Sequence, residues 1–104
     1  MNDERRKEGR VQAIIEVIWE GANTQYQART SDLTTSGCFI DTIGQAAVGD
    51  IVTFKLLLPA KDSIEIQGEV LYSYPHSGFG VRFTNVSETD QKKLEWLVKA
   101  RALA

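Results

Sequence analysis

Alternation of apolar and polar side chains near the N-terminus is the feature that most constrains the fold of this chain. In the segment VQAIIEVIWE, residues 11–20, polar Gln12, Glu16 and Glu20 stand opposite an apolar set. The apolar set consists of Val11, Ala13, Ile15, Val17 and Trp19. A period of two residues is typical of a β-strand with one buried and one solvated face, because successive side chains point to opposite sides of a strand. Residues 11–20 are therefore predicted to form such a strand.

Further strand patterns follow, separated by turn-forming residues such as Gly, Pro, Asn and Asp. They cover residues 25–31, 38–42, 51–58, 63–74 and 79–84. In the long segment 63–74, alternation predicts that Ile64, Ile66, Val70 and Tyr72 point inward. Short strands at such close intervals predict a six-stranded antiparallel β-barrel, because closure of the sheet removes its exposed edges.

The period of the pattern changes near the C-terminus. Ser87 and Asp90 resemble a capping box, with Asp in the position of Glu or Gln. Leu94, Leu97 and Val98 then recur at helical spacing, which predicts one amphipathic helix over residues 88–101, covering an open end or face of the barrel. The fold class is therefore all-β with a C-terminal helix. Residues 11–104 are expected to form this single domain, and residues 1–10 a flexible N-terminal arm.

Composition excludes several classes of function. The chain of 104 residues has 12 basic and 14 acidic side chains and a net charge of −2, which argues against binding along the phosphates of DNA or RNA. The single cysteine, Cys38, and the single histidine, His76, cannot supply an internal disulfide or a Cys/His metal cage. They also offer little for nucleophilic catalysis. We therefore expect no catalytic residues, no metal, no cofactor and no enzyme activity.

The hydropathy of the chain also carries an expectation about location. No apolar run approaches the roughly 20 residues that a membrane span needs. The first ten residues, MNDERRKEGR, are charged where a signal peptide would become apolar. We expect a cytoplasmic protein with no membrane insertion.

An arginine pair, Arg6 and Arg10, lies four residues apart just before the first predicted strand, with Arg5 beside it. A guanidinium matches phosphate oxygens and the O6/N7 edge of guanine bidentately, and it stacks on base planes. The pair is therefore a candidate clamp for a ligand that offers both phosphates and guanines. The alternative is a solvated charged tail that nearby acidic residues neutralise.

A second motif occupies the predicted turn DLTTSG, with Asp32, Thr34 and Gly37 at its first, third and sixth positions. All three are ordinary turn formers, since Asp and Thr bond nearby backbone and Gly tolerates a positive φ. In a binding site, Asp32 would accept from the N1–H and N2–H₂ edge of guanine or orient an arginine. Thr34 would donate to a phosphate, and Gly37 would let the backbone approach the ligand.

Taken together, the RxxxR arm, the DxTxxG turn and the later segment GFGVRF, residues 78–83, resemble the PilZ domain. PilZ domains are a bacterial family of receptors for the second messenger cyclic di-GMP. The resemblance covers essentially the whole chain and implies a six-stranded antiparallel barrel with a C-terminal helix. It also implies cyclic di-GMP as the ligand and a role in second-messenger signalling.

The resemblance assigns roles to particular residues. Arg6 and Arg10 would grip guanine and phosphate, and Arg5 would add a phosphate contact. Asp32, Thr34 and Gly37 would form the turn that receives the same nucleotide. Thr34 stands where the family usually has Ser, so the hydroxyl is kept but a methyl group and a stiffer χ1 are added.

Different classes of function remain open at this stage. In the first, nucleotide binding orders the arm against the barrel, and an unidentified effector protein reads the changed surface. In the second, the protein is a PilZ-like interaction module that binds nucleotide weakly or not at all. A third class, an OB-like binder of single strands, would need exposed aromatic side chains among basic ones, whereas Trp19 lies on an apolar face.

Overall fold

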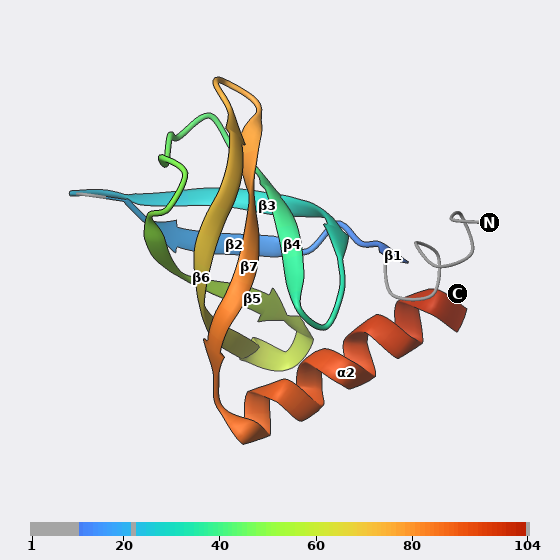
Figure 1. The fold of residues 1–104 in the computed structure, drawn as a ribbon. Helices are drawn as coiled ribbons and strands as arrows, with labels where there is room; N and C mark the ends of the chain where they lie inside the picture. The colour runs from blue at the N-terminus through green and yellow to red at the C-terminus, as the bar shows by residue number, and fades with distance from the viewer. Residues whose placement is uncertain (1–10, 22, 104) are drawn as a thin grey trace.

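The computed structural model describes residues 11–21 and 23–103, which form a strand-rich body with a C-terminal helix (Figure 1). The strands are β1 (Val11–Gln12), β2 (Glu16–Glu20), β3 (Gln25–Leu33), β4 (Gly37–Asp41), β5 (Ile51–Leu58), β6 (Asp62–Tyr74) and β7 (Gly78–Val86). A turn of 3-10 helix, η1 (Pro59–Lys61), joins β5 to β6, and the helix α2 (Glu88–Leu103) follows β7.

Strands β2 to β7 close into a ring. The order of pairing around the ring is β2, β3, β4, β7, β6, β5 and back to β2, and each of these pairs is antiparallel. The short strand β1 adds a pairing to the end of β3. The prediction of a six-stranded antiparallel barrel with one C-terminal helix is thus confirmed. Apart from the interruption described below, the element boundaries agree with the predicted ones within two residues.

The barrel interior is centred on aromatic side chains. Trp19 is fully buried, stacks on Tyr26 with ring centroids 4.5 Å apart, and meets Phe79 edge-on at 5.0 Å. Its indole N–H donates to the hydroxyl of Thr42 (3.1 Å), so the polar edge of the ring is satisfied inside the core. These contacts tie β2, β3 and β7 together.

The predicted strand over residues 11–20 is interrupted at Ala13–Ile15, where the pairing register with β3 shifts by one residue. The buried hydroxyl of Thr30 fills the gap. It accepts a hydrogen bond from the backbone N–H of Ile15 (3.1 Å) and donates to the carbonyl of Ala13. These two side-chain hydrogen bonds replace backbone bonds that regular strand pairing would make at Ile15 and Ala13. The alternation of buried and exposed residues continues through the interruption.

The prediction that Tyr72 points inward is wrong. Its side chain is 41% exposed, whereas Val70 is fully buried. The register between β6 and β7 shifts between these two residues, which makes Leu71 an extra residue and reverses the side-chain alternation. The ring of Tyr72 lies over Gly80, where a Cβ would come within 2.3 Å of the ring carbon Cζ. The aromatic side chain therefore belongs to the outer surface.

Helix α2 lies across one end of the barrel and buries Leu94, Leu97 and Val98. The hydroxyl of Ser87 accepts the backbone N–H of Asp90 (3.1 Å), which is the predicted N-cap. The Asp90 carboxylate accepts from the backbone N–H of Glu65 in β6 (3.0 Å) instead of completing the capping box. This carboxylate therefore ties the start of the helix to the barrel wall.

Candidate functional site

Thr34 organises the turn between β3 and β4. Its backbone N–H donates to the carbonyl of Gly37 (2.8 Å). Its hydroxyl accepts the backbone N–H groups of Ser36 (3.0 Å) and Gly37 (2.9 Å), and lies 3.2 Å from the Gly37 carbonyl oxygen. The hydroxyl thus braces the turn from within, which is the ordinary turn-forming role that the sequence left open.

Gly37 is required by the packing of β4 against β7. Its φ angle is outside the left-handed region, so the turn does not need the conformational freedom of glycine here. A Cβ at this position would lie 2.6 Å from the carbonyl oxygen of Val81 in β7. Any larger side chain would therefore force the two strands apart.

A hollow of about 310 Å³ on the outer surface brings Asp32, Thr34 and Gly37 together. Its other walls come from β6 and β7 and include Leu71, Tyr72, Val81 and Arg82. Asp32 is half-buried, and its register partner on β4 is Phe39. The three turn residues predicted from the sequence therefore share one recess, and a guanidinium joins them there.

Arg82 is a candidate site residue that the sequence analysis missed. Its guanidinium donates to the carboxylate of Glu69 (2.6 Å), and its side chain is 57% exposed. Such an exposed ion pair contributes little to stability, so the guanidinium can turn to a ligand at small cost. The sequence could have indicated that Arg82 faces outward, because it stands between Val81 and Phe83, which pack inward. For Tyr72, which also lines the hollow, the sequence offered no such indication, since this residue faces outward only because of the register shift.

The arginines of the N-terminal motif, Arg5, Arg6 and Arg10, lie outside the described residues, as does the predicted flexible arm. Strand β1, which follows them in the sequence, is described by the structure. Val11 is the register partner of Leu33, and Gln12 is the partner of Asp32. The arginine motif is therefore joined directly to the strand that pairs beside the DxTxxG turn.

Cys38 follows the turn and is buried in the barrel wall. Burial raises the pKa of its thiol far above the usual range, and the negative charge of Asp32 raises it further. The reactive thiolate is therefore scarce at neutral pH. This environment is that of a core side chain.

The burial of Cys38 leads to a prediction. In the folded protein at pH 8, its thiol is expected to react with a disulfide reagent at least about 100-fold more slowly than in the protein unfolded by guanidinium. The release of the coloured thiolate measures both rates. Equal rates would contradict the burial of the thiol.

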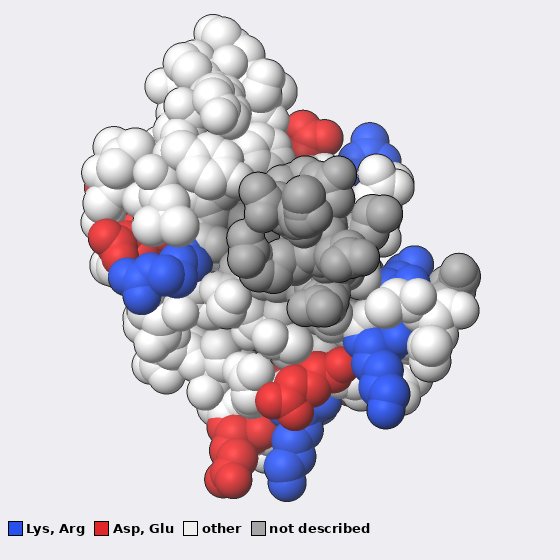
Figure 2. All heavy atoms as spheres, turned by 45° about the vertical axis from the view of Figure 1, so that its right-hand side comes forward, with Lys and Arg blue, Asp and Glu red and all other residues white. Residues whose placement is uncertain are grey.

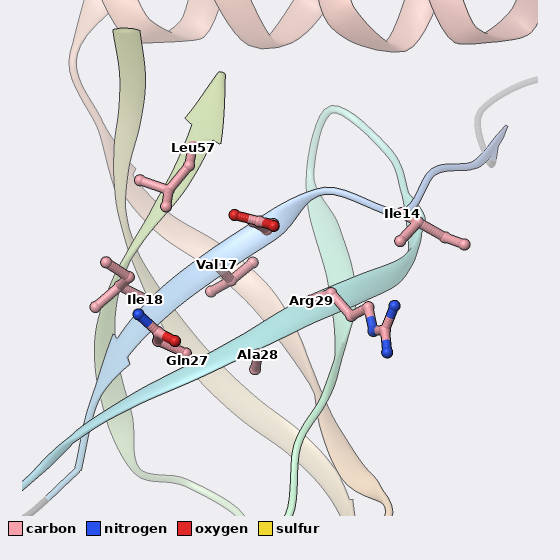
Figure 3. A pocket seen from close by; sticks show the side chains of 8 residues that line it. Ile14, Val17, Ile18, Gln27, Ala28, Arg29 and Leu57 are labelled. Atoms are coloured by element: carbon pink, nitrogen blue, oxygen red, sulfur yellow. The ribbon is translucent and has the colours of Figure 1, made fainter. Parts of the chain in front are cut away.

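A larger hollow of about 530 Å³ lies over β2, β3 and β5 (Figure 3). Side chains such as Ile18, Gln27 and Leu57 line it, with Arg29 toward one side. Glu16, the register partner of Arg29, also belongs to its lining. Of the motif residues that the structure describes, Asp32, Thr34 and Gly37, none lines this hollow. The chemistry of the motifs therefore selects the smaller hollow, although the larger one offers more volume.

Charged side chains on one face of the molecule lie in small groups (Figure 2). On the face in Figure 2, basic residues lie apart from one another, several of them beside carboxylates. Within residues 11–21 and 23–103, no group of three or more metal-ligating side chains occurs. In the same part of the chain, no helix is long and apolar enough to cross a membrane.

Comparison with family models matches residues 4–100 to the PilZ domain, which is nearly the whole chain. The chain belongs to the PilZ domain family. The resemblance first drawn from the motifs is therefore confirmed. PilZ domains are binding and regulatory modules.

Solved PilZ-like structures share this fold. The Bacillus subtilis inhibitor of motility, MotI/DgrA, matches with a TM-score of 0.81 and 14% identity, over 91% of this chain and 50% of that protein. The PilZ domain of CeSA, from a cellulose-synthesizing bacterium, matches with a TM-score of 0.66 and 16% identity, over 88% and 95%. The PilZ domain of Escherichia coli YcgR, a structure with c-di-GMP, matches with a TM-score of 0.69 and 16% identity, over 88% and 87%.

Because the sequence identities are low, these likenesses show the shared fold alone. The chain spans half the length of the Bacillus protein that it matches. No curated protein sequence matches the chain.

Proposed function

We propose that this PilZ domain is a cytoplasmic bacterial receptor for cyclic di-GMP, with no enzyme activity and no cofactor besides that nucleotide ligand. The observation that carries the proposal is the pairing of β1 with the end of β3, where Gln12 lies opposite Asp32. This pairing joins the RxxxR motif to the edge of the barrel that holds the turn motif. Guanidinium groups and a carboxylate together match a ligand that offers both phosphates and guanines.

Each site residue has a separate role in this proposal. Arg6 and Arg10 grip guanine and phosphate, and Arg5 adds a phosphate contact. Asp32 accepts hydrogen bonds from the guanine edge or orients an arginine. Thr34 and Gly37 hold the turn in the conformation that receives the nucleotide, and the Thr34 hydroxyl reaches a phosphate when it exchanges its donor bond within the turn. Arg82, in the same hollow, supplies a further guanidinium.

The signal is relayed to an effector protein. Binding orders the arm against the barrel, and the effector reads the changed surface. The solved relatives support this reading, since one is a PilZ domain with c-di-GMP and another is named an inhibitor of motility. The proposal includes no binding of DNA or RNA and no insertion into a membrane.

Calorimetric titration of the full chain tests the proposed ligand. Cyclic di-GMP is expected to bind at least about tenfold more tightly than GMP at low salt, because GMP offers only one guanine and one phosphate to the two arm arginines. Equal affinity for GMP, or no heat with cyclic di-GMP, would reject the proposal and favour the protein-interaction module.

Substitutions of Thr34 distinguish its role in holding the turn from its proposed contact with a phosphate. Thr34→Ser keeps the hydroxyl and is expected to bind cyclic di-GMP as tightly as the parent or more tightly. Thr34→Val removes the acceptor of two backbone N–H groups as well as the proposed phosphate donor, and is expected to lose about 1–3 kcal/mol of binding free energy. Calorimetry measures affinity, and thermal melting measures the turn's contribution to stability. If Thr34→Val binds as the parent does but melts earlier, the hydroxyl serves only the turn.

A further inference from the structure

A hollow that is more apolar than the one at the turn motif lies between α2 and the connection from β5 to β6. Helix α2 crosses this end of the barrel (Figure 1). The volume of the hollow is about 770 Å³, and its walls are mainly apolar. Leu58 and Pro59 form one wall, and Trp96, Leu97 and Ala100 form the other. We refer to this hollow as the helix groove.

Trp96 is the most unusual side chain of the helix groove. It is 68% exposed, although tryptophan carries a large apolar surface. The helix is held on the barrel by Leu94, Leu97 and Val98, which are buried. Trp96 is therefore not needed to dock the helix. An exposed tryptophan at the side of an apolar recess is typical of a residue that anchors a binding partner.

Three of the four charged residues that line the helix groove are basic. Lys93 donates to the carboxylate of Asp62 (2.7 Å) and lies 3.6 Å from that of Asp90. The bond from Lys93 lowers the pKa of Asp62, so this carboxylate stays ionised and its charge is matched. Lys92 and Arg101 also line the groove, are exposed, and have no ion pair with any described residue. The helix groove is thus an apolar recess with two cations that pair with no carboxylate among residues 11–21 and 23–103.

We propose that the helix groove binds a segment of a partner protein that presents apolar side chains flanked by carboxylates. The apolar side chains pack against Trp96 and the wall of Leu58 and Pro59, and the carboxylates face Lys92 and Arg101. A second copy of this chain fits poorly, because two such grooves would bring like charges together. A flat lipid surface would touch Trp96 but would leave the recess beneath it unfilled.

This proposal goes beyond the proposed function, because the helix groove shares no lining residue with the hollow that holds the turn motif. Occupancy of the helix groove does not depend on the nucleotide. Binding to the helix groove and binding of cyclic di-GMP can therefore fail separately when the groove is tested without nucleotide.

The test uses the full chain without nucleotide and a synthetic helical peptide of about 18 residues. The peptide carries leucines at positions i, i+3, i+4 and i+7 and glutamates beside them. It is expected to bind saturably and to shift the emission of Trp96 to the blue, since Trp19 is already fully buried. The same peptide with lysine in place of every glutamate is expected to bind at least about tenfold more weakly.

Matched variants locate the site. Lys92→Glu combined with Arg101→Glu is expected to weaken binding of the glutamate peptide at least about tenfold. Lys99→Glu reverses one charge, as each of the two groove substitutions does, at an exposed helix position that does not line the groove, and is expected to change affinity by less than about twofold. Trp96→Ala, measured with a fluorescein-labelled peptide, is expected to weaken binding while the melting temperature stays that of the parent.

Several results would overturn the assignment. These are equal binding of the lysine peptide, no binding of the glutamate peptide, and unchanged affinity of the Lys92→Glu, Arg101→Glu variant. Binding to phosphatidylglycerol vesicles without binding to the peptide would assign the groove to a lipid surface instead. A dimer in sedimentation that excludes the peptide would assign it to a second copy of the chain.

Discussion

A shortened chain that begins at Val11 is expected to bind cyclic di-GMP at least about 100-fold more weakly than the full chain, a loss of about 2.7 kcal/mol. The deletion removes Arg5, Arg6 and Arg10, whose guanidiniums are proposed to contact phosphate and guanine. The barrel is expected to stay folded, because the shortened chain keeps every core residue that the structure describes, from Val11 to Val98. Calorimetry measures the affinity, and circular dichroism during heating measures the stability.

Point variants of the full chain refine this result. Arg6→Ala combined with Arg10→Ala is expected to reproduce the loss, whereas Lys7→Ala, a cation of the same segment outside the motif, is the matched control. Arg10→Lys is expected to weaken binding too, because an ammonium cannot reproduce a planar bidentate or stacked contact. A shortened chain with full affinity would show that the arm is not part of the site.

Hydrogen exchange tests the proposed ordering of the arm. Ordering each backbone residue costs about 1–2 kcal/mol, so the contacts with the nucleotide must recover that cost. With cyclic di-GMP, protection is expected to rise in residues 5–10 and 32–37, with little change in α2. Equal protection of the arm with and without nucleotide would reject the ordering mechanism and favour the interaction module.

The barrel could be predicted because burial alternates along its strands with the period that the sequence shows. Val17 and Trp19 are both buried, as their spacing indicates. The change to helical spacing at Leu94 likewise located α2. These elements are determined by local pattern, and a barrel is the closed form that leaves no strand edge exposed.

The errors arose where strands change register. The register shift next to Val70 turns Tyr72 outward, and the interruption at Ala13–Ile15 depends on the hydroxyl of Thr30 from another strand. A register shift of one residue is set by the pairing with the neighbouring strand. The alternation of apolar and polar residue types in the sequence of the shifted strand does not show it. Both features are therefore visible only in three dimensions.

The turn motif was located from the sequence, and the backbone bonds of Thr34 match the turn-forming role that the sequence offered, but the reason for Gly37 was not predicted. Thr34 is bonded within the turn, and Gly37 is small because β7 passes close to it. The bonds of Thr34 are local to the turn, whereas the reason for Gly37 comes from tertiary packing. The same packing brings Arg82, which is distant in sequence, into the hollow with Asp32.

Gly37→Ala is expected to lower the free energy of unfolding by about 1–3 kcal/mol, the usual cost of overpacking. The new Cβ would lie 2.6 Å from the carbonyl oxygen of Val81, which is backbone and cannot rotate away as a flexible side chain could. Relief requires β4 and β7 to separate where Phe83 donates its backbone N–H to Ser36 (2.8 Å). Thermal melting is expected to shift down by about 4–8 °C for each kcal/mol.

The same substitution is expected to weaken cyclic di-GMP binding, because Gly37, Val81 and Arg82 all line the hollow and move with the two strands. Gly49→Ala is the matched control. A Cβ there meets no atom within 4 Å, but the φ angle of 94° strains any larger residue, so about 1 kcal/mol of stability should be lost with affinity unchanged. If Gly37→Ala melts as the parent does but no longer binds the nucleotide, the glycine serves the approach of the ligand, and the steric explanation from β7 is wrong.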